Sequence, residues 1–129
     1  MEIRILTEQE VKDTIRENKI TFREFYINKK VYGGISSNNE VIAMCPVSHN
    51  KQLKNARKIY SPFVKGGNIE IGTELLKYVV KDNKGFIIYA DFLTDTIPMF
   101  QGANFIIAYK QTDLKRYGIL WRGVIDYAC

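Results

Sequence analysis

A segment in the middle of the chain, residues 60–80, joins an apolar extended run to an amphipathic helix through a basic turn that contains glycine. It reads YSPFVKGGNIEIGTELLKYVV. Proteins that alternate strands and helices often hold a phosphate at such a junction, because backbone N–H groups and the positive end of the helix dipole point at the anion. Glycine lets the anion approach closely. An ordinary strand–turn–helix joint that uses Gly66 and Gly67 as its turn is an alternative of about equal weight.

Length and composition predict one globular domain, residues 1–129. No apolar run reaches the roughly 18–20 residues that span a bilayer, and Met1–Thr7 is too short and too charged for a signal peptide. Cys45 and Cys129 have neither metal-site spacing nor the density of a disulfide scaffold. We therefore expect a cytoplasmic protein that holds no metal and makes no contact with a membrane.

The positive charge of the chain is concentrated in one stretch. The net charge is +5, and residues 41–69 contain no Asp or Glu. The cations of this stretch are Lys51, Lys54, Arg57, Lys58 and Lys65. A segment of one sign beside a phosphate-type turn favours an anionic ligand, either a polyphosphate cofactor or nucleic acid. A solvated basic face is the alternative.

The N-terminal part of the chain carries local signals for a strand and a helix. Residues 3–6 are predicted to form a short strand. Thr7 and Glu10 form a capping box, in which the Thr hydroxyl and the Glu carboxylate each accept a bond from an otherwise unpaired N–H, so a helix begins here. Residues 21–30 are rich in aromatic side chains and are compatible with either a second helix or a loop.

The next elements follow from apolar runs. Two runs, residues 31–37 and 41–47, flank the polar sequence Ser37-Asn38-Asn39-Glu40 and predict a hairpin. Residues 56–64 are predicted to form one further strand.

The C-terminal half alternates helices and strands. The apolar spacing of residues 69–80 puts Ile69, Leu76, Val79 and Val80 on one face and predicts a helix packed on both flanks. Residues 86–92 form a near-continuous apolar run that suits a central strand covered on both faces. A short helix at 97–103 and antiparallel strands at 105–109 and 118–125 complete the order β-α-(α)-β-β-β-α-β-α-β-β, which is an α/β (α+β) fold with a mixed central sheet.

This order and two motifs resemble the GNAT acyltransferases. Ile71-Gly72-Thr73-Glu74-Leu75-Leu76 is similar to the Ile-Gly-Thr-x-Leu-Leu helix start of that superfamily, and residues 99–105 stand where its second motif follows strand five. The resemblance covers roughly residues 30–125. It implies a GNAT-like fold, an acetyl-CoA or other acyl-CoA cofactor, an amine as acceptor, and a homodimer paired through the last strands.

A second resemblance is to the phage Mom-like branch of this superfamily. Its Tyr-Ala-Asp strand end and its Tyr-Gln-Ala-x-Asn-Phe motif are similar to Tyr89-Ala90-Asp91 and to residues 100–105. The resemblance implies a phage or prophage protein whose acceptor is a small-molecule or nucleobase amine. DNA base modification, with nucleic acid as partner, is therefore an alternative function.

The resemblance and the residue types together give a set of candidate site residues. Asp91, at a strand end, is the candidate general base, and Tyr89 is the second catalytic candidate. Backbone N–H groups of the strand at 56–64 would stabilise the oxyanion. The candidate cofactor-binding residues are Tyr60, Ser61, Lys65, Gly66, Gly67, Asn68, Ile69, Gly72, Thr73 and Asn104.

Two residues depart from the pattern of the superfamily. Glu70 takes the position of the first loop glycine, and Phe100 replaces the tyrosine that often acts as general acid. Gly66, Gly67 and Asn68 are then expected to form the anion nest, with Lys65 as counter-charge. The same departures motivate a third reading, a non-catalytic phage protein that binds a host factor.

Overall fold

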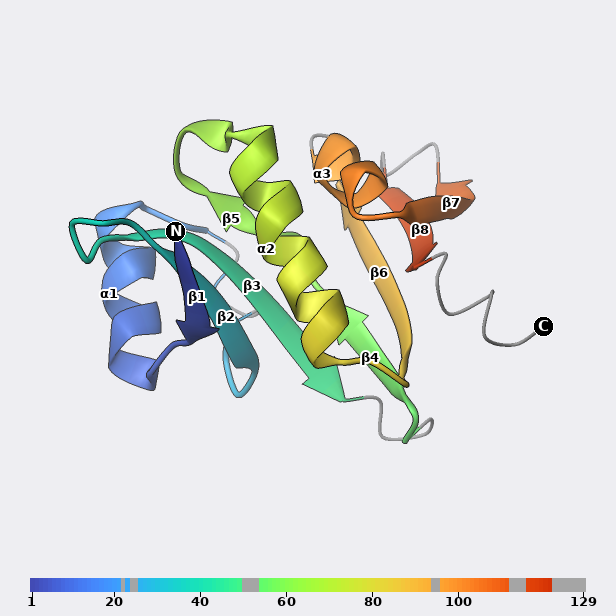
Figure 1. The fold of residues 1–129 in the computed structure, drawn as a ribbon, viewed down its shortest axis with the longest axis horizontal. Helices are drawn as coiled ribbons and strands as arrows, with labels where there is room; N and C mark the ends of the chain where they lie inside the picture. The colour runs from blue at the N-terminus through green and yellow to red at the C-terminus, as the bar shows by residue number, and fades with distance from the viewer. Residues whose placement is uncertain (22, 24–25, 50–53, 94–95, 112–115, 122–129) are drawn as a thin grey trace.

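The computed structural model describes residues 1–21, 23, 26–49, 54–93, 96–111 and 116–121 (Figure 1). Its eight strands form one mixed sheet in the order β1-β2-β3-β4-β6-β8-β7, with β5 paired to β3. Among the strands of the described residues, only β4 and β6 pair in the parallel direction. The elements are β1 (Glu2–Ile5), α1 (Glu8–Glu17), β2 (Lys30–Ile35), β3 (Val41–His49), β4 (Ala56–Ile59), β5 (Phe63–Val64), α2 (Ile69–Asp82), β6 (Ile87–Leu93), α3 (Ile97–Gly102), β7 (Phe105–Gln111) and β8 (Arg116–Trp121).

The predicted order of elements is confirmed with two differences. The described residues between α1 and β2 form no α-helix; residues 22 and 24–25, which belong to the ambiguous stretch, lie outside the described part of the chain. The second difference is that the single strand expected over residues 56–64 is two strands. No helix among the described residues is long and apolar enough to cross a membrane.

Two groups of buried side chains occupy the two faces of the sheet. Alternate residues of β3, such as Ala43 and Cys45, join the larger cluster under α2 and α3. Met44, which points to the opposite face, joins the smaller cluster under α1. Figure 1 shows α2 running along the sheet, with α3 beside its N-terminal half and α1 at the other end of the molecule.

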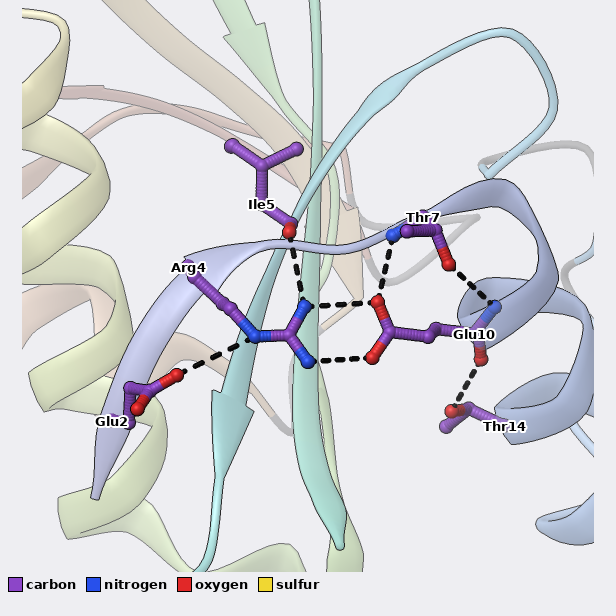
Figure 2. A network of polar contacts seen from close by, with 6 residues as sticks. All are labelled: Glu2, Arg4, Ile5, Thr7, Glu10 and Thr14. Carbon is purple, nitrogen blue, oxygen red and sulfur yellow. Dashed lines mark hydrogen bonds and ion pairs between the residues drawn. The ribbon is translucent and has the colours of Figure 1, made fainter. Parts of the chain in front are cut away.

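The start of α1 confirms the predicted capping box and adds an ion pair to it (Figure 2). The Thr7 hydroxyl accepts from the Glu10 N–H at 3.2 Å, and the Glu10 carboxylate accepts from the Thr7 N–H at 2.9 Å. Arg4 on β1 donates two bonds to the same carboxylate, at 2.9 and 2.6 Å. This guanidinium and the backbone donor lower the pKa of Glu10 from 4.5 to about 2.

Helix α2 buries one stripe of side chains instead of both flanks. Leu75, Leu76 and Val79 are fully buried, but Ile69 is 49% exposed and Tyr78 is 41% exposed. Ile69 shares the apolar face that the spacing predicts, but it is not part of the core. It occupies the first helical position of α2.

The C-terminal end of α2 is fixed to β2 by buried polar groups. The Tyr32 hydroxyl hydrogen-bonds to Asp82, and the Asn83 amide donates to the same hydroxyl at 3.1 Å and to the Val79 carbonyl at 2.7 Å. Burial and the neighbouring carboxylate raise the pKa of Tyr32. These bonds set the position of α2 along the sheet.

The run predicted as one strand divides because its first half pairs with both β3 and β6, whereas its second half pairs with β3 alone. Residues Ala56–Ile59 pair parallel to β6, whereas Phe63 and Val64 pair with Met44 and Ala43 of β3. Pro62 lies between the two halves and has no N–H to continue a ladder. The Tyr60 N–H donates to the Pro46 carbonyl of β3 at 3.0 Å, which keeps this segment beside β3.

Strand β6 is central in the sheet but is not covered on both faces. Ile88 and Ala90 are buried under α2, whereas Ile87 is 37% exposed. Of β4 and of residues 87–90, the part of β6 whose side chains the structure describes, no residue belongs to the smaller core cluster beneath α1. The near-continuous apolar run suggested burial on both sides, but α1 packs against the opposite end of the sheet.

Candidate active site

The two parallel strands at the centre of the sheet diverge at a defined point. Their register ends at the pair Ile59 and Ala90. Beyond it, Asp91–Leu93 of β6 remains paired to β8 only, while the chain after β4 stays beside β3 and pairs with it again as β5. Asp91 and Tyr60 therefore follow directly after the last pair, on the two sides of the divergence. An opening between diverging parallel strands is a place where α/β sheets accept ligands.

The glycine turn lies between β5 and α2. Lys65–Gly67 form one turn of 3₁₀ helix, in which Gly66 and Gly67 have φ values of 73° and 67°. An added Cβ on either glycine would meet no atom within 4 Å. Glycine is therefore needed here for backbone conformation, and the turn is open on its outer side.

Asn68 ends the glycine turn and caps α2. Its side-chain oxygen accepts from the Ile71 N–H at 3.1 Å, and its carbonyl accepts from the Gly72 N–H at 3.2 Å. Two of the N–H groups of the first turns are thus already paired. An anion at this end would be met by the N–H groups nearer the turn, at Ile69 and Glu70.

Lys65 has a partner that the sequence did not indicate. Its ammonium forms an ion pair with Glu40, in the hairpin turn between β2 and β3. Both side chains are about half exposed, 52% and 47%. An incoming anion would compete with Glu40 for Lys65, so this carboxylate limits the contribution of the lysine to anion binding.

Gly72 and Thr73, two predicted cofactor residues, contact α3. A Cβ on Gly72 would lie 2.2 Å from the Met99 sulfur, and a Cβ on Gly102 would lie 2.8 Å from the Thr73 methyl carbon. The Thr73 hydroxyl donates to the Met99 carbonyl at 3.4 Å. These small residues let α2 and α3 approach closely, and that packing explains the Ile-Gly-Thr sequence without reference to a phosphate.

Tyr60 and Ser61, two candidates for cofactor binding, occupy the break between β4 and β5. Ser61 Oγ lies 3.5 Å from Thr96 Oγ1, at the start of α3. Tyr60 receives a bond from the Ser48 hydroxyl at 3.4 Å. The break between β4 and β5 and the N-terminal half of α2 therefore both lie beside α3. The Ser61 side chain faces the start of α3, whereas the Tyr60 side chain faces Ser48 on β3.

The remaining candidates lie in two places, on β6 and in the turn after α3. Tyr89 is half-buried on β6, where it is paired across the ladder with Lys58. Asp91 is paired through its backbone with Gly118 of β8. Asn104 is exposed, with φ of 69°, in the turn that ends α3. Phe100 is fully buried and packs edge-on against Phe105, with ring centroids 5.0 Å apart.

Sequence reasoning missed a cluster of cations around Tyr60. The ammonium groups of Lys29 and Lys58 lie 5.5 and 5.0 Å from the centroid of its ring. Lys58 was visible as one of the cations of residues 41–69, but nothing in the sequence joined Lys29 to it. The described residues hold no group of three metal-type ligands; Cys45 is buried, which raises its thiol pKa, and His49 is exposed.

Comparison with solved structures identifies the fold. The chain is similar to a histone acetyltransferase HPA2 and related acetyltransferase from Corynebacterium glutamicum, with 9% identity over 92% of this chain and 94% of the other, at a TM-score of 0.68. It is also similar to an acetyltransferase of GNAT family from Staphylococcus aureus, with 16% identity, coverage of 92% and 96%, and a TM-score of 0.60. The chain thus has the GNAT acetyltransferase fold.

A further match shows that this fold is not confined to proteins described as acetyltransferases. A bacterial toxin shares 10% identity over 92% of this chain and 89% of its own, with a TM-score of 0.55. No protein-family model and no curated protein sequence matches the chain. At these identities the similarity establishes the architecture, and the activity must be argued from the site.

Proposed function

We propose that this protein is an acyl-CoA-dependent N-acyltransferase. The observation that carries the proposal is the combination of an open glycine turn at the start of α2 with parallel central strands, β4 and β6, that diverge after Ile59 and Ala90. The turn suits a pyrophosphate, because its glycines leave a space that any Cβ would partly fill and the helix dipole favours an anion there. The GNAT acetyltransferases with this fold support the choice of cofactor.

The residues of the turn and the strand break would have separate tasks. Gly66, Gly67 and the first N–H groups of α2 would hold the pyrophosphate, with Lys65 as counter-charge. The break at Tyr60 and Ser61 would receive the pantetheine arm and direct a backbone N–H at the acyl oxygen. When bound, an acyl-CoA supplies an acyl carbon activated as a thioester.

Asp91 would accept the proton of the attacking amine, directly or through a water that it orients. Because phenylalanine has no ionisable group, Phe100 supplies no proton at the position that often holds a tyrosine acid. We therefore assign no side chain as general acid. Asp91→Asn should reduce kcat by about a hundredfold, the usual contribution of a positioned proton-transfer group, and leave CoA affinity nearly unchanged.

Titration calorimetry with CoA and acetyl-CoA tests the cofactor assignment, and the chain offers a matched control. Gly67→Asp should abolish binding because it adds a negative charge and a Cβ at the phosphate. Gly85→Asp makes the same change at a glycine that also has positive φ and open space, but at the other end of α2. It should bind CoA as the unaltered protein does. Absence of heat at millimolar ligand, or equal effects of both variants, would refute the proposal.

A Mom-like DNA base modification is the second candidate, favoured by the acid-free basic stretch, part of which lies on β4. Its test is mass spectrometry of nucleosides from DNA co-expressed with the protein, and an unmodified digest would count against it. A non-catalytic protein that binds a host factor would instead retain a partner in pull-downs and acylate no amine.

A further inference from the structure

The face of the sheet opposite α2 carries a compact group of polar and aromatic side chains. Ser48, Lys58 and Tyr89 are direct neighbours across β3, β4 and β6. Because Ile59 and Ala90, the next pair along, belong to the core under α2, alternation places Lys58 and Tyr89 on the other face. All three side chains are partly exposed.

Tyr60 is the centre of this group. The ammonium of Lys58 lies 5.0 Å from its ring centroid and that of Lys29 lies 5.5 Å away. The Ser48 hydroxyl donates to the Tyr60 oxygen at 3.4 Å. Lys29 comes from the turn before β2 and Lys58 from β4, so the tertiary fold brings two cations to one ring. Tyr60 is also the residue at which the strands diverge.

The two ammonium groups are not balanced by acids among the described residues. Neither takes part in the ion pairs that the described side chains form within 4 Å, whereas Lys65, Lys30 and Lys12 each have a carboxylate partner. Two like charges around one ring repel each other, and an anion bound between them would relieve that repulsion. Hydrogen bonds from ammonium groups to an anion are also among the stronger ones.

We infer that Lys29, Lys58 and Tyr60 bind an anionic group of the acceptor, so that the amine substrate carries a carboxylate or a phosphate. The inference rests on the proposed function. A cofactor held at the start of α2 would lie on one face of the sheet. Lys58 and Tyr89 lie on the other face, directly before the point at which β4 and β6 diverge, so an acceptor bound there would reach the divergence from the side opposite to the cofactor.

NMR titration of the isotope-labelled protein tests the inference with two pairs of probes that differ only in the anionic group. The first pair is O-phosphoethanolamine and ethanolamine, and the second is L-glutamate and L-glutamine. In each pair that the site accepts, we expect the anionic probe to bind at least about tenfold more tightly, the ratio that a charge-assisted contact supplies. If the ratio of affinities is larger for the first pair, the acceptor carries a phosphate; if it is larger for the second pair, the acceptor carries a carboxylate. The perturbed amides should include those of Lys58 and Tyr60.

Single substitutions test which residues cause the preference for the anionic probe. Lys58→Gln and Lys29→Gln should each reduce it several-fold, whereas Lys77→Gln, a change of the same kind at an exposed position of α2, should leave it intact. Equal binding of charged and neutral probes, no binding of any, or perturbations confined to Gly66 and Gly67 would overturn the inference. The titrations are run with and without saturating CoA, so that failure to bind CoA refutes the proposed function without affecting the reading of the anion site.

Discussion

Replacing Gly72 by alanine would place a methyl carbon 2.2 Å from the sulfur of Met99 and 2.8 Å from its Cγ. Met99 is itself 4% exposed, so its side chain cannot move into solvent without leaving the core. Overpacking of this kind costs about 1–3 kcal/mol. Alanine recovers up to about 1 kcal/mol through its higher helix propensity. The net expectation is a loss of about 1 kcal/mol in the free energy of unfolding.

A second substitution, Met99→Ala, tests whether the contact between Gly72 and Met99 causes this loss of stability. In a Met99→Ala background the clashing atoms are absent, so Gly72→Ala should stabilise the protein by up to about 1 kcal/mol, the propensity difference alone. Met99→Ala by itself should cost about 2–5 kcal/mol through the cavity it leaves. The coupling between the two positions should therefore be on the order of 2 kcal/mol, within the range for residues in contact.

Urea unfolding of the four proteins, followed by circular dichroism, measures this cycle, and calorimetry with CoA is run in parallel. If Gly72→Ala stabilises the protein with Met99 present, the close approach of α2 to α3 is not as described. If the variant keeps its stability but loses CoA binding, Gly72 contacts the phosphates, as the sequence motif suggested, and the packing explanation fails.

Three further changes test interactions away from this contact. Glu10→Gln should cost about 1 kcal/mol near pH 7, after allowance for solvent screening of the pair with Arg4. Because the folded pKa of Glu10 is depressed from 4.5 to about 2, that stability is present above pH 4.5 and is lost as the pH falls toward 2, so the variant should show a flatter urea-stability profile in this window. Glu40→Gln removes the carboxylate that competes for Lys65 and should tighten CoA binding about two- to fivefold by calorimetry; weaker binding would mean that Glu40 positions the lysine. Tyr32→Phe should lower the free energy of unfolding by about 1–2 kcal/mol, because the buried Asn83 amide loses an acceptor; an unchanged urea midpoint would contradict this.

Much of the fold could be predicted because its signals are local. The capping box at Thr7 and Glu10 uses bonds between residues three apart. The cap of α2 by Asn68 also spans three residues. The hairpin of β2 and β3 needs only a short polar turn between two apolar runs. Where pattern and partner lie in the same few residues, sequence alone determines the element.

The sequence predicted which types of residue form the candidate site better than it predicted which residues contact one another there. The glycine turn at Gly66 and Gly67 is visible in the sequence, and the structure gives both residues the positive φ that only glycine adopts readily. Gly72 carries the same type of signal, yet it contacts Met99 on another helix. A sequence motif identifies the glycine. The tertiary packing around it decides whether its missing side chain leaves room for a ligand or for a neighbouring helix.

The sequence by itself determined the order of elements, the helix start at residue 69 and the concentration of positive charge between residues 41 and 69. The tertiary structure alone decided where one apolar run divides into β4 and β5, that Lys65 meets Glu40 at a separation of 25 residues, and that Lys29 and Lys58 share one tyrosine ring. Each of these depends on contacts between distant segments, which form only when the whole sheet closes and which no local pattern of hydrophobicity or turn residues encodes.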